Sequence, residues 1–562
     1  MKKIVIYTFL TLFLTSCFDM DLNPLSEGSS ENWYSSEEEL LMSVRSLYST
    51  AYWSLDDDSY TDDWTNRDAV NDITGGTMDG LSSISSTFWI NKYAAIGRTN
   101  ELLANLPKAQ SLGISADLLK KLEAEAKLVR AIQHASLVAH YGDIVYVPHT
   151  IPTISEAFEI GRTDKKEVMQ YVYKDFDDAI AVLDKEIEGE VRANSKGIAY
   201  AFKARAALYV GDYDIAADAA KKCIDLGVYS LHNDFTELFL SSTKNNKEFI
   251  FTRPRAIENG VYIGTQTFTP RTAGGWAQYV PSWDLFCAFL CVDGKPIDES
   301  PLFNPREPFL NRDPRCTQTI VEFKTRHMGF EYNPHPDALT VLNFNTGAQV
   351  RNTDNRAVAQ YASYNGLVWK KWVDDTWSQN GHKADKNEIV MRYADVLLMY
   401  AEAKIELGEI DQSVLDAIND VRARAYGVNR AQTTAYPSVT TKDAAELRRI
   451  VRLERRMEFA FEGLRYMDLI RWKMAEKVLN RPVYGMLDPA NLKKDVVNEG
   501  LWFFSETPKI DKDGIADFSS LYQNKKIKLL VERKFDAKRQ YLWPIPSKEI
   551  LINENIKQNA GY

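Results

Sequence analysis

The segment from Ile389 to Gly427 limits the fold of this chain most, because apolar residues recur at helical spacing on both sides of a glycine. Steps of three and four residues place them on one helix face; the first set is Val390, Ala394, Leu397, Leu398, Ala401 and Ile405. Gly408 follows, where a helix ends readily in the left-handed conformation. The second set is Val414, Ala417, Ile418 and Val421. Two helices joined by a short turn form a hairpin, the unit of a helical repeat protein.

A second stretch, from Ala199 to Leu226, repeats this layout around a Gly211-Asp212 turn. Small residues flank the turn, and Cys223 falls on the inner face of the second helix. Thr163 to Leu183 begins a further hairpin, with Thr163 as the predicted N-cap. These hairpins resemble tetratricopeptide repeats of about 34 residues. The predicted fold class is mostly α, with tetratricopeptide-like helical hairpins in an α/α superhelix and a large insertion of irregular loops and short strands.

The formal net charge is −10 over 562 residues, so no basic excess recruits nucleic acid or an anionic membrane surface. The changes in periodicity divide the chain into four predicted parts. These are a lipoprotein signal peptide (1–16), an N-terminal helical region with two hairpins (17–234), a variable loop-rich insertion (235–388), and a C-terminal helical region with further hairpins and an extended tail (389–562).

The N-terminus has the pattern of an export signal. Lys2 and Lys3 precede an apolar run, 4–14, that is too short to span a bilayer permanently. Leu14-Thr15-Ser16-Cys17 then resembles a bacterial lipoprotein signal, in which Cys17 is acylated and becomes the mature N-terminus. An ordinary signal peptide with a chance cysteine is the alternative. Acyl chains contribute about 0.8 kcal/mol per buried CH₂, so Cys17 would hold a soluble body on a membrane without a spanning helix.

The other cysteines, Cys223, Cys287, Cys291 and Cys316, form no regular disulfide framework. Cys287 and Cys291 are one helical turn apart, but no second pair accompanies them, and we interpret them as small buried residues rather than metal ligands. No metal site and no cofactor is predicted. Asp56-Asp57-Asp58 is acidic enough to attract Ca²⁺, yet we interpret it as part of a solvated loop.

Two stretches lose helical periodicity and hold the candidate binding residues. Residues 53–87 are polar, acidic and glycine-containing, which is typical of a long functional loop. The insertion between the hairpins is rich in Gly, Pro and aromatic residues, and its FIFTRPR run at 249–255 has a strand-like composition. Trp89, by contrast, begins a regular helix and is expected in the core.

Residues 446–472 combine an apolar seam with a dense run of mixed charges. The seam steps by three and four and is interrupted at Gly463, which predicts a pair of helices. Mixed charges at helical spacing more often form a structural ion-pair network than a ligand site. We therefore expect these charges to support the fold.

Together these features resemble the SusD/RagB family of outer-membrane nutrient-uptake lipoproteins over essentially the whole chain. The matching pieces are Cys17, WINKYAAIGRTNELL, EAEAKLVRAIQHASLVAHYGD, NRDPR at 311–315, RYADVLLMYAEA, ERRMEFAFEGLRYMDLIRW, and the terminal WPIP and QNAGY. Their order and spacing together are specific. The resemblance implies four tetratricopeptide-like hairpins, docking onto a SusC-like TonB-dependent transporter, and capture of glycan or peptide at the cell surface.

The resemblance also implies a binding site made from two stretches, here Trp53–Thr87 and roughly Arg253–Trp283. Trp276 is similar in position to a stacking aromatic of a starch-binding member, and Trp64 and Asn66 fall where that member has a Trp and an Asn. The predicted ligand-binding set is Trp64, Asn66, Arg67, Arg271, Trp276 and Tyr279. Flat rings match the C–H faces of sugars, while planar polar side chains match their hydroxyls. For each Trp, packing is the alternative to binding.

The predicted protein is a non-enzymatic lipoprotein of the outer membrane that faces the cell exterior and delivers an oligomeric nutrient, foremost a glycan, to its transporter. A surface glycoside hydrolase is one alternative, but Asp62, Asp63 and Asp72 are expected in an open polar loop where they stay ionised. A helical-repeat scaffold that binds only protein partners is the other. The sequence has no phosphate loop, nucleophile elbow or metal motif.

Overall fold

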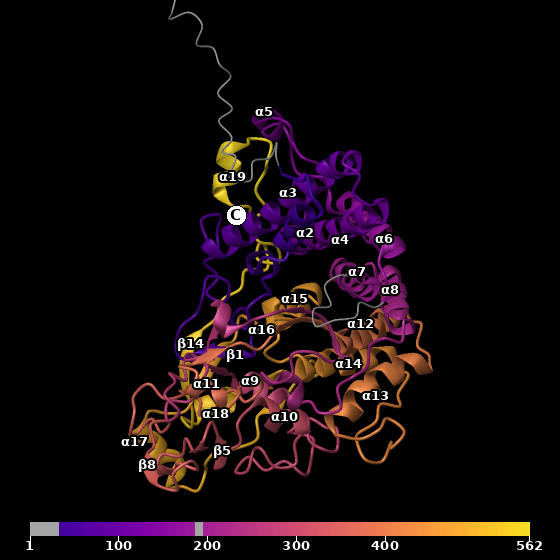
Figure 1. The fold of residues 1–562 in the computed structure, drawn as a ribbon. Coiled ribbons are helices and arrows are strands. Elements are labelled where there is room, and N and C mark those ends of the chain that lie inside the picture. Colours follow the sequence, from indigo (N-terminus) through magenta and orange to yellow (C-terminus); the bar gives the residue numbers. More distant parts are fainter. Residues whose placement is uncertain (1–32, 186–194) are drawn as a thin grey trace, which may run out of the picture.

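The computed structural model describes residues 33–185 and 195–562, so the predicted signal peptide and Cys17 lie outside the described residues. Helices make up 42% of the structure and strands 11%, which confirms the mostly α fold class. The N-terminal helices and the last C-terminal helix form the upper part of Figure 1, the other C-terminal helices lie below them, and loop-rich segments gather at the lower left. Within the described residues, no helix combines the length and apolar character needed to cross a membrane.

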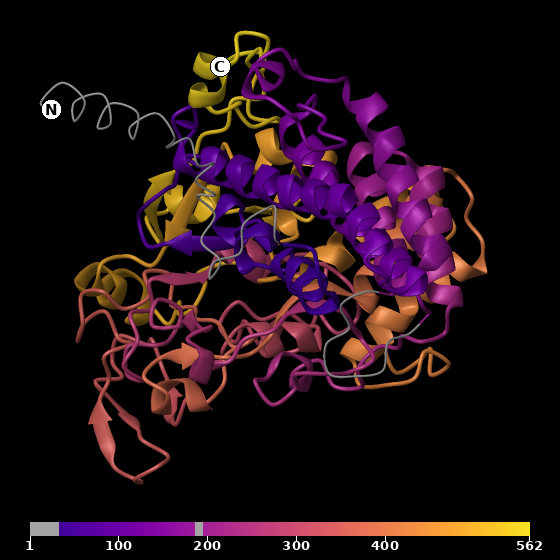
Figure 2. The same ribbon diagram turned by 45° about the horizontal axis from the view of Figure 1, so that its top comes forward.

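The N-terminal region is built from helices, the long ones of which lie side by side in Figure 2. They are α2 (Glu37–Ser46), α3 (Ser83–Ser111), α4 (Ala116–Tyr141), α5 (Ile154–Ala157), α6 (Lys165–Val182), α7 (Lys196–Val210) and α8 (Tyr213–Asp225). Helix α3 packs on α4, α4 on α6, and α7 on α8. Trp89 and Cys223 are buried, as predicted. Asp164, rather than Thr163, caps α6, because its side chain accepts the Lys166 N–H.

The C-terminal region adds a second set of helices. They are α12 (Tyr393–Glu406), α13 (Gln412–Ala425), α14 (Ala444–Glu458), α15 (Arg465–Arg471), α16 (Ala475–Val478) and α19 (Ser547–Ile552). Gly408 and Gly463 follow α12 and α14 with φ of +73° and +72°, which confirms both predicted helix ends. The tail was predicted to be extended; residues 543–546 form neither helix nor strand, and α19 begins directly after Pro546.

Val390 was predicted on the face of a helix, but it belongs to strand β10 (Glu388–Arg392). That strand pairs antiparallel with β2 (Phe249–Arg253), the segment predicted to be a strand. The distant partner strand satisfies the backbone of 388–392, so the helix starts only at Tyr393.

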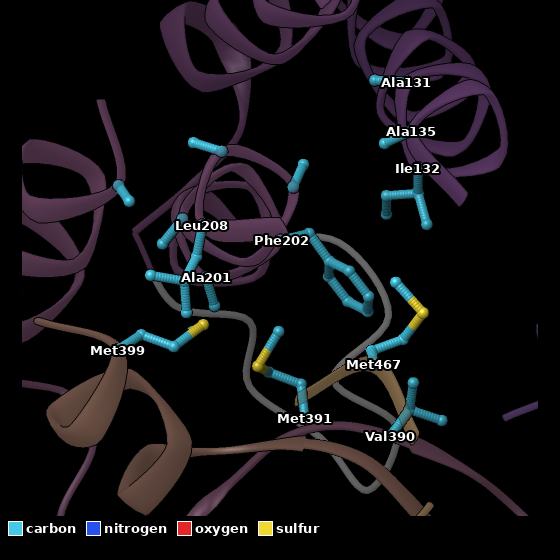
Figure 3. Close-up of a cluster of buried hydrophobic side chains, with 14 of the residues drawn as sticks. Ala131, Ile132, Ala135, Ala201, Phe202, Leu208, Val390, Met391, Met399 and Met467 are labelled. Carbon is cyan, nitrogen blue, oxygen red and sulfur yellow. The ribbon is translucent and has the colours of Figure 1, made fainter. Parts of the chain in front are cut away.

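The two helical regions share one hydrophobic core, since α12 packs against α8 as well as α13 and α14. In Figure 3, Phe202 of α7 lies beside Met391 of β10 and Met467 of α15, with Met399 of α12 nearby. The hairpins at 199–226 and 389–427 are therefore neighbours in one scaffold, although the insertion separates them in the chain.

The insertion folds into short antiparallel strand pairs around a second core. The pairs are β3 (Ile263–Gly264) with β9 (Lys383–Ala384), β5 (Thr325–His327) with β6 (Phe330–Tyr332), and β7 (Thr340–Leu342) with β8 (Gln349–Arg351). The C-terminal region contributes β11 (Pro482–Gly485) with β14 (Lys528–Glu532), and β12 (Lys509–Ile510) with β13 (Ala516–Asp517). Short helices lie between them: α9 (Trp283–Ala288), α10 (Pro314–Thr319), α11 (Thr376–Gln379), α17 (Pro489–Leu492) and α18 (Ser519–Gln523). Cys287, Cys291 and Cys316 are unbridged and buried here, which confirms their interpretation as small core residues.

The charged run of α14 forms a buried ion-pair network, as predicted. Glu458 lies 2.7 Å from Arg392 and 3.1 Å from Arg315, the arginine that ends the NRDPR motif, and it also pairs with Arg424. Burial alone would raise the pKa of Glu458, but the three guanidiniums outweigh it and hold that pKa below its ordinary value. The network thus links the insertion, through Arg315, to both C-terminal hairpins.

Candidate binding site

A two-stranded ribbon joins the two stretches that the resemblance assigned to the site. Strand β1 (Trp64–Asn66) pairs antiparallel with β4 (Tyr279–Pro281), with Asn66 opposite Tyr279. A 3₁₀ turn at 50–53 leads into the loop 53–87, a second one at 58–60 precedes β1, and α3 begins at Ser83, before the predicted end of the loop. The ribbon places five of the six predicted residues within one region of the surface.

Trp64 forms the aromatic floor of this region. Its side chain is 7% exposed, and its ring lies 4.7 Å from the Tyr279 ring and 5.5 Å, edge to face, from Phe268. Phe461, which follows α14, packs 5.9 Å away. Packing therefore accounts for most of the Trp64 surface, and the ring supports Tyr279 from below.

Trp276 is the exposed aromatic of the region, with 45% of its surface accessible. The preceding glycines allow its placement, because a Cβ on Gly275 would lie 2.2 Å from the Thr269 carbonyl oxygen and Gly274 adopts φ of +90°. The backbone N–H of Trp276 donates to the Gln266 carbonyl at 2.7 Å. The side chain is thus presented to solvent from a fixed backbone.

Arg67 connects Trp276 to a second exposed aromatic, Tyr361. Its Nη2 donates to the Trp276 carbonyl at 2.9 Å and to the Tyr361 carbonyl at 3.3 Å, and its guanidinium lies 5.1 Å from the Tyr361 ring centroid. Tyr361 is 49% exposed. Tyr361 is not among the residues predicted from the sequence, because its only local signal is the polar, glycine-containing run YASYNG, which contains no tryptophan.

Polar side chains adjoin these rings. Gln278 Nε2 donates to Asn66 Oδ1 at 3.2 Å, and Asn66 and Tyr279 line a hollow of about 200 Å³ together with Asn71. Arg271 is set back from this hollow: its backbone N–H donates to Asp354 at 2.7 Å, and its carbonyl accepts the Gly274 N–H. Arg271 therefore shapes the turn that leads to Trp276.

Loop 53–87 is anchored by buried charges, which corrects the expectation of an open polar loop at Asp62 and Asp63. Arg456 donates to both carboxylates at 2.8 Å, and Arg465 donates to Asp62 at 3.0 Å. Burial opposes ionisation of Asp62, but the two arginines hold its pKa below the ordinary value. Burial, with Asp62 as a second cause, raises the pKa of Asp63. The arginines that neutralise these carboxylates come from α14 and α15, about 400 positions later in the chain. The local sequence, which looks like a solvated acidic run, therefore could not predict the pairing.

The three consecutive aspartates diverge rather than gather around one point. Asp56 pairs with His140 at 2.9 Å, Asp57 accepts the Ser59 N–H, and Asp58 accepts the Gly463 N–H. Within residues 33–185 and 195–562, no three His, Cys, Asp or Glu side chains are grouped so that they could hold a metal ion. These carboxylates fasten the loop to α4 and to the turn after α14.

Comparisons with known proteins agree with this architecture. Residues 239–562 match the SusD family, and residues 27–208 match a family described as starch-binding associating with outer membrane. The chain is 26% identical to SusD-like protein P2 of Formosa agariphila, with all of both chains covered. It is similar to a SusD-like carbohydrate binding protein of Bacteroides fragilis, with 27% identity, a TM-score of 0.75, and coverage of 93% of this chain and 99% of the other. A further SusD-like protein of that organism, 22% identical, shares the fold with a TM-score of 0.73 over 96% and 100% of the chains.

Proposed function

The chain belongs to the SusD family, and on that premise we propose that it is a cell-surface lipoprotein that binds an oligomeric glycan and delivers it to a SusC-like TonB-dependent transporter. It acts as a binder without catalytic chemistry of its own. The similar Bacteroides fragilis protein is named as carbohydrate binding, and one matching family is named for association with the outer membrane. Both descriptions support the proposal.

The observation that carries the glycan assignment is the exposed pair of Trp276 and Tyr361, both tied to Arg67 through their carbonyls. Exposed aromatic rings with a fixed backbone offer flat surfaces to the C–H faces of sugar rings. Asn66 and Gln278 lie beside them and supply amide groups that can exchange hydrogen bonds with hydroxyls. Trp64 supports this surface through Tyr279, so it contributes by packing.

Attachment to the outer membrane rests on Cys17. Acylation of this residue would tether the folded body, whose described residues contain no helix able to span a bilayer. Cell fractionation of a Cys17→Ala variant tests the anchor, because loss of the acyl chains should move the protein from the membrane fraction to the soluble fraction. A variant that remains in the membrane fraction would contradict lipid anchoring.

Binding is tested with a glycan array and a peptide panel, using the full chain in detergent. The glycan that binds is then titrated against Trp276→Ala, and we expect at least a tenfold weaker affinity. Tyr522→Ala is the matched control, because Tyr522 is equally exposed at 44% and lies outside this region. Equal binding by all three proteins would reject the surface. Release of new reducing ends would favour a hydrolase, and co-purification with the transporter without any bound sugar or peptide would favour a protein scaffold.

A further inference from the structure

A second pocket lies behind the Trp64 ring, between loop 53–87 and the insertion. It has a volume of about 300 Å³, which is at the lower end of the range for small-molecule sites. Five aromatic residues line it: Trp64, Phe268, Trp372, Trp377 and Phe461. Its size and aromatic walls suit one flat ring-shaped ligand residue.

Unsatisfied polar atoms gather in this pocket. Among the described residues, four buried atoms of its lining have no hydrogen-bond partner: Asp58 Oδ1, Trp64 Nε1, Thr265 Oγ1 and Trp377 Nε1. A buried polar group without a partner costs about 1–3 kcal/mol, and most such groups in folded proteins are satisfied. These four lining residues therefore have hydrogen-bonding capacity that the protein itself does not use.

Lys386 adds a buried amino group to the same lining. Lys386 is only 7% exposed. Its Nζ lies 3.3 Å from the Trp372 ring centroid and 5.6 Å from the Trp377 ring centroid. No carboxylate in the described parts of the chain forms an ion pair with it. Burial lowers the pKa of Lys386, and Arg255 acts in the same direction. Aromatic faces therefore take the place of the carboxylate that a buried lysine ordinarily has.

The carboxylates near Lys386 are already engaged. Glu388 pairs with Arg253 and Arg255, and Glu462 pairs with Lys371 and Arg392. Asp56 pairs with His140, as described above, and Asp57 is exposed at the rim and accepts the Ser59 N–H. None of these carboxylates forms an ion pair with Lys386, although Glu388 and Glu462 favour its charged form from a greater distance.

The free groups of the pocket are predominantly donors. The two indole N–H groups can only donate, and the lysine and the threonine hydroxyl can donate as well. Burial raises the pKa of Asp58, so its carboxyl is held toward the protonated form, in which it can donate. A carboxylate or a sulfate provides several acceptors and no donor, which complements this set.

We propose that the pocket binds one acidic sugar residue, either a uronic acid or a sulfated sugar, with its anionic group facing Lys386 and its ring against the tryptophans. This inference rests on the proposed glycan-binding function and narrows the class of glycan. The segment of Lys386 adjoins the surface of Trp276, because β9 pairs with β3 and the Thr265 N–H donates to the His382 carbonyl at 2.8 Å. One bound glycan chain can therefore contact both the pocket and the surface of Trp276.

The test is calorimetric titration of the full chain in detergent with methyl glucuronide, methyl glucoside 6-sulfate and methyl glucoside. We expect at least one acidic sugar to bind ten or more times tighter than the neutral one, and the one that does identifies the anionic group. Lys386→Met should abolish this preference. Trp377→Phe, which keeps a ring and removes one donor, should weaken the acidic sugar by at least threefold.

Lys383→Met is the matched control, because Lys383 is three residues from Lys386 in the chain but lies over the Tyr262 ring, and it should keep the preference. Equal affinity for neutral and acidic sugars would overturn the pocket assignment, as would a preference that survives Lys386→Met. Equally tight binding of acetylated trialanine, a peptide carboxylate, would also overturn it. Neutral glycan binding that depends on Trp276 but shows no acidic preference would leave the proposed function standing and reject this inference alone.

Discussion

Arg456 of α14 donates a hydrogen bond of 2.8 Å to Asp62, which lies 394 residues earlier in the chain. Both side chains are buried, and Asp63 accepts from the same guanidinium. The contact fixes the loop that leads into β1 against the C-terminal helices. It is therefore one of the links through which the scaffold positions the binding ribbon.

Replacing Arg456 with methionine should lower the free energy of unfolding by about 3–5 kcal/mol, because it leaves buried carboxylates without a counter-charge. Urea denaturation measures the change. Arg430→Met is the control, since its pairs with Asp416 and Asp420 are more than one-third exposed and should contribute at most about 1 kcal/mol. Equal losses in the two variants would show that burial of the Arg456 pair has no energetic consequence.

Gly463 and Gly408 can be compared to measure how much close packing adds to the stability cost of replacing a glycine that follows a helix. Both have positive φ, but a Cβ on Gly463 would lie 2.4 Å from the Asp56 carbonyl oxygen, whereas Gly408 faces open space. Gly408→Ala should cost about 1 kcal/mol through backbone strain alone. Gly463→Ala should cost about 2–3 kcal/mol more, because Asp56 must move. Thermal unfolding of both variants measures the difference, and identical melting temperatures would contradict it.

Stability should fall when the pH is lowered from about 4 to about 2. Burial opposes ionisation of Asp395, but Arg455 and Arg205 lower its pKa to about 2. Since this value is below that of the unfolded chain, the unfolded state binds more protons in that interval, and protonation favours unfolding. The expected loss from this group is about 2 kcal/mol. Urea denaturation of wild type and Asp395→Asn at several pH values measures it, and parallel pH curves would exclude Asp395 as the cause.

Arg67→Ala should weaken glycan binding five- to tenfold, about 1 kcal/mol, because Trp276 and Tyr361 both lose a hydrogen bond to their carbonyls. Titration with the glycan found on the array measures the change. Arg326→Ala is the control, because its ion pair with Asp375 is more than half exposed. An unaltered affinity in Arg67→Ala would mean that the two aromatic residues hold their positions without it.

Much of the scaffold was predictable because helix periodicity is a local property. The steps of three and four around Gly408 and Gly463 predicted the helices and their ends, and the buried Trp89 and Cys223 agree with that pattern. Val390 was assigned wrongly because its environment depends on β2, a strand some 140 residues earlier. A periodic pattern cannot report a partner that distant.

The same distinction between local pattern and distant contacts applies to the candidate site. The sequence by itself determined the helical hairpins, whereas the family resemblance implied the two stretches of the candidate site and left each of its tryptophans open between binding and packing. Only the tertiary structure decided that Trp64 is packed, that Tyr361 joins Trp276 through Arg67, and that Asp62 and Asp63 are neutralised by α14 and α15. The physical reason is that burial and charge pairing depend on which distant side chains meet, and the strand pairing of β1 with β4 and the ion pairs of Arg456 bring those side chains together.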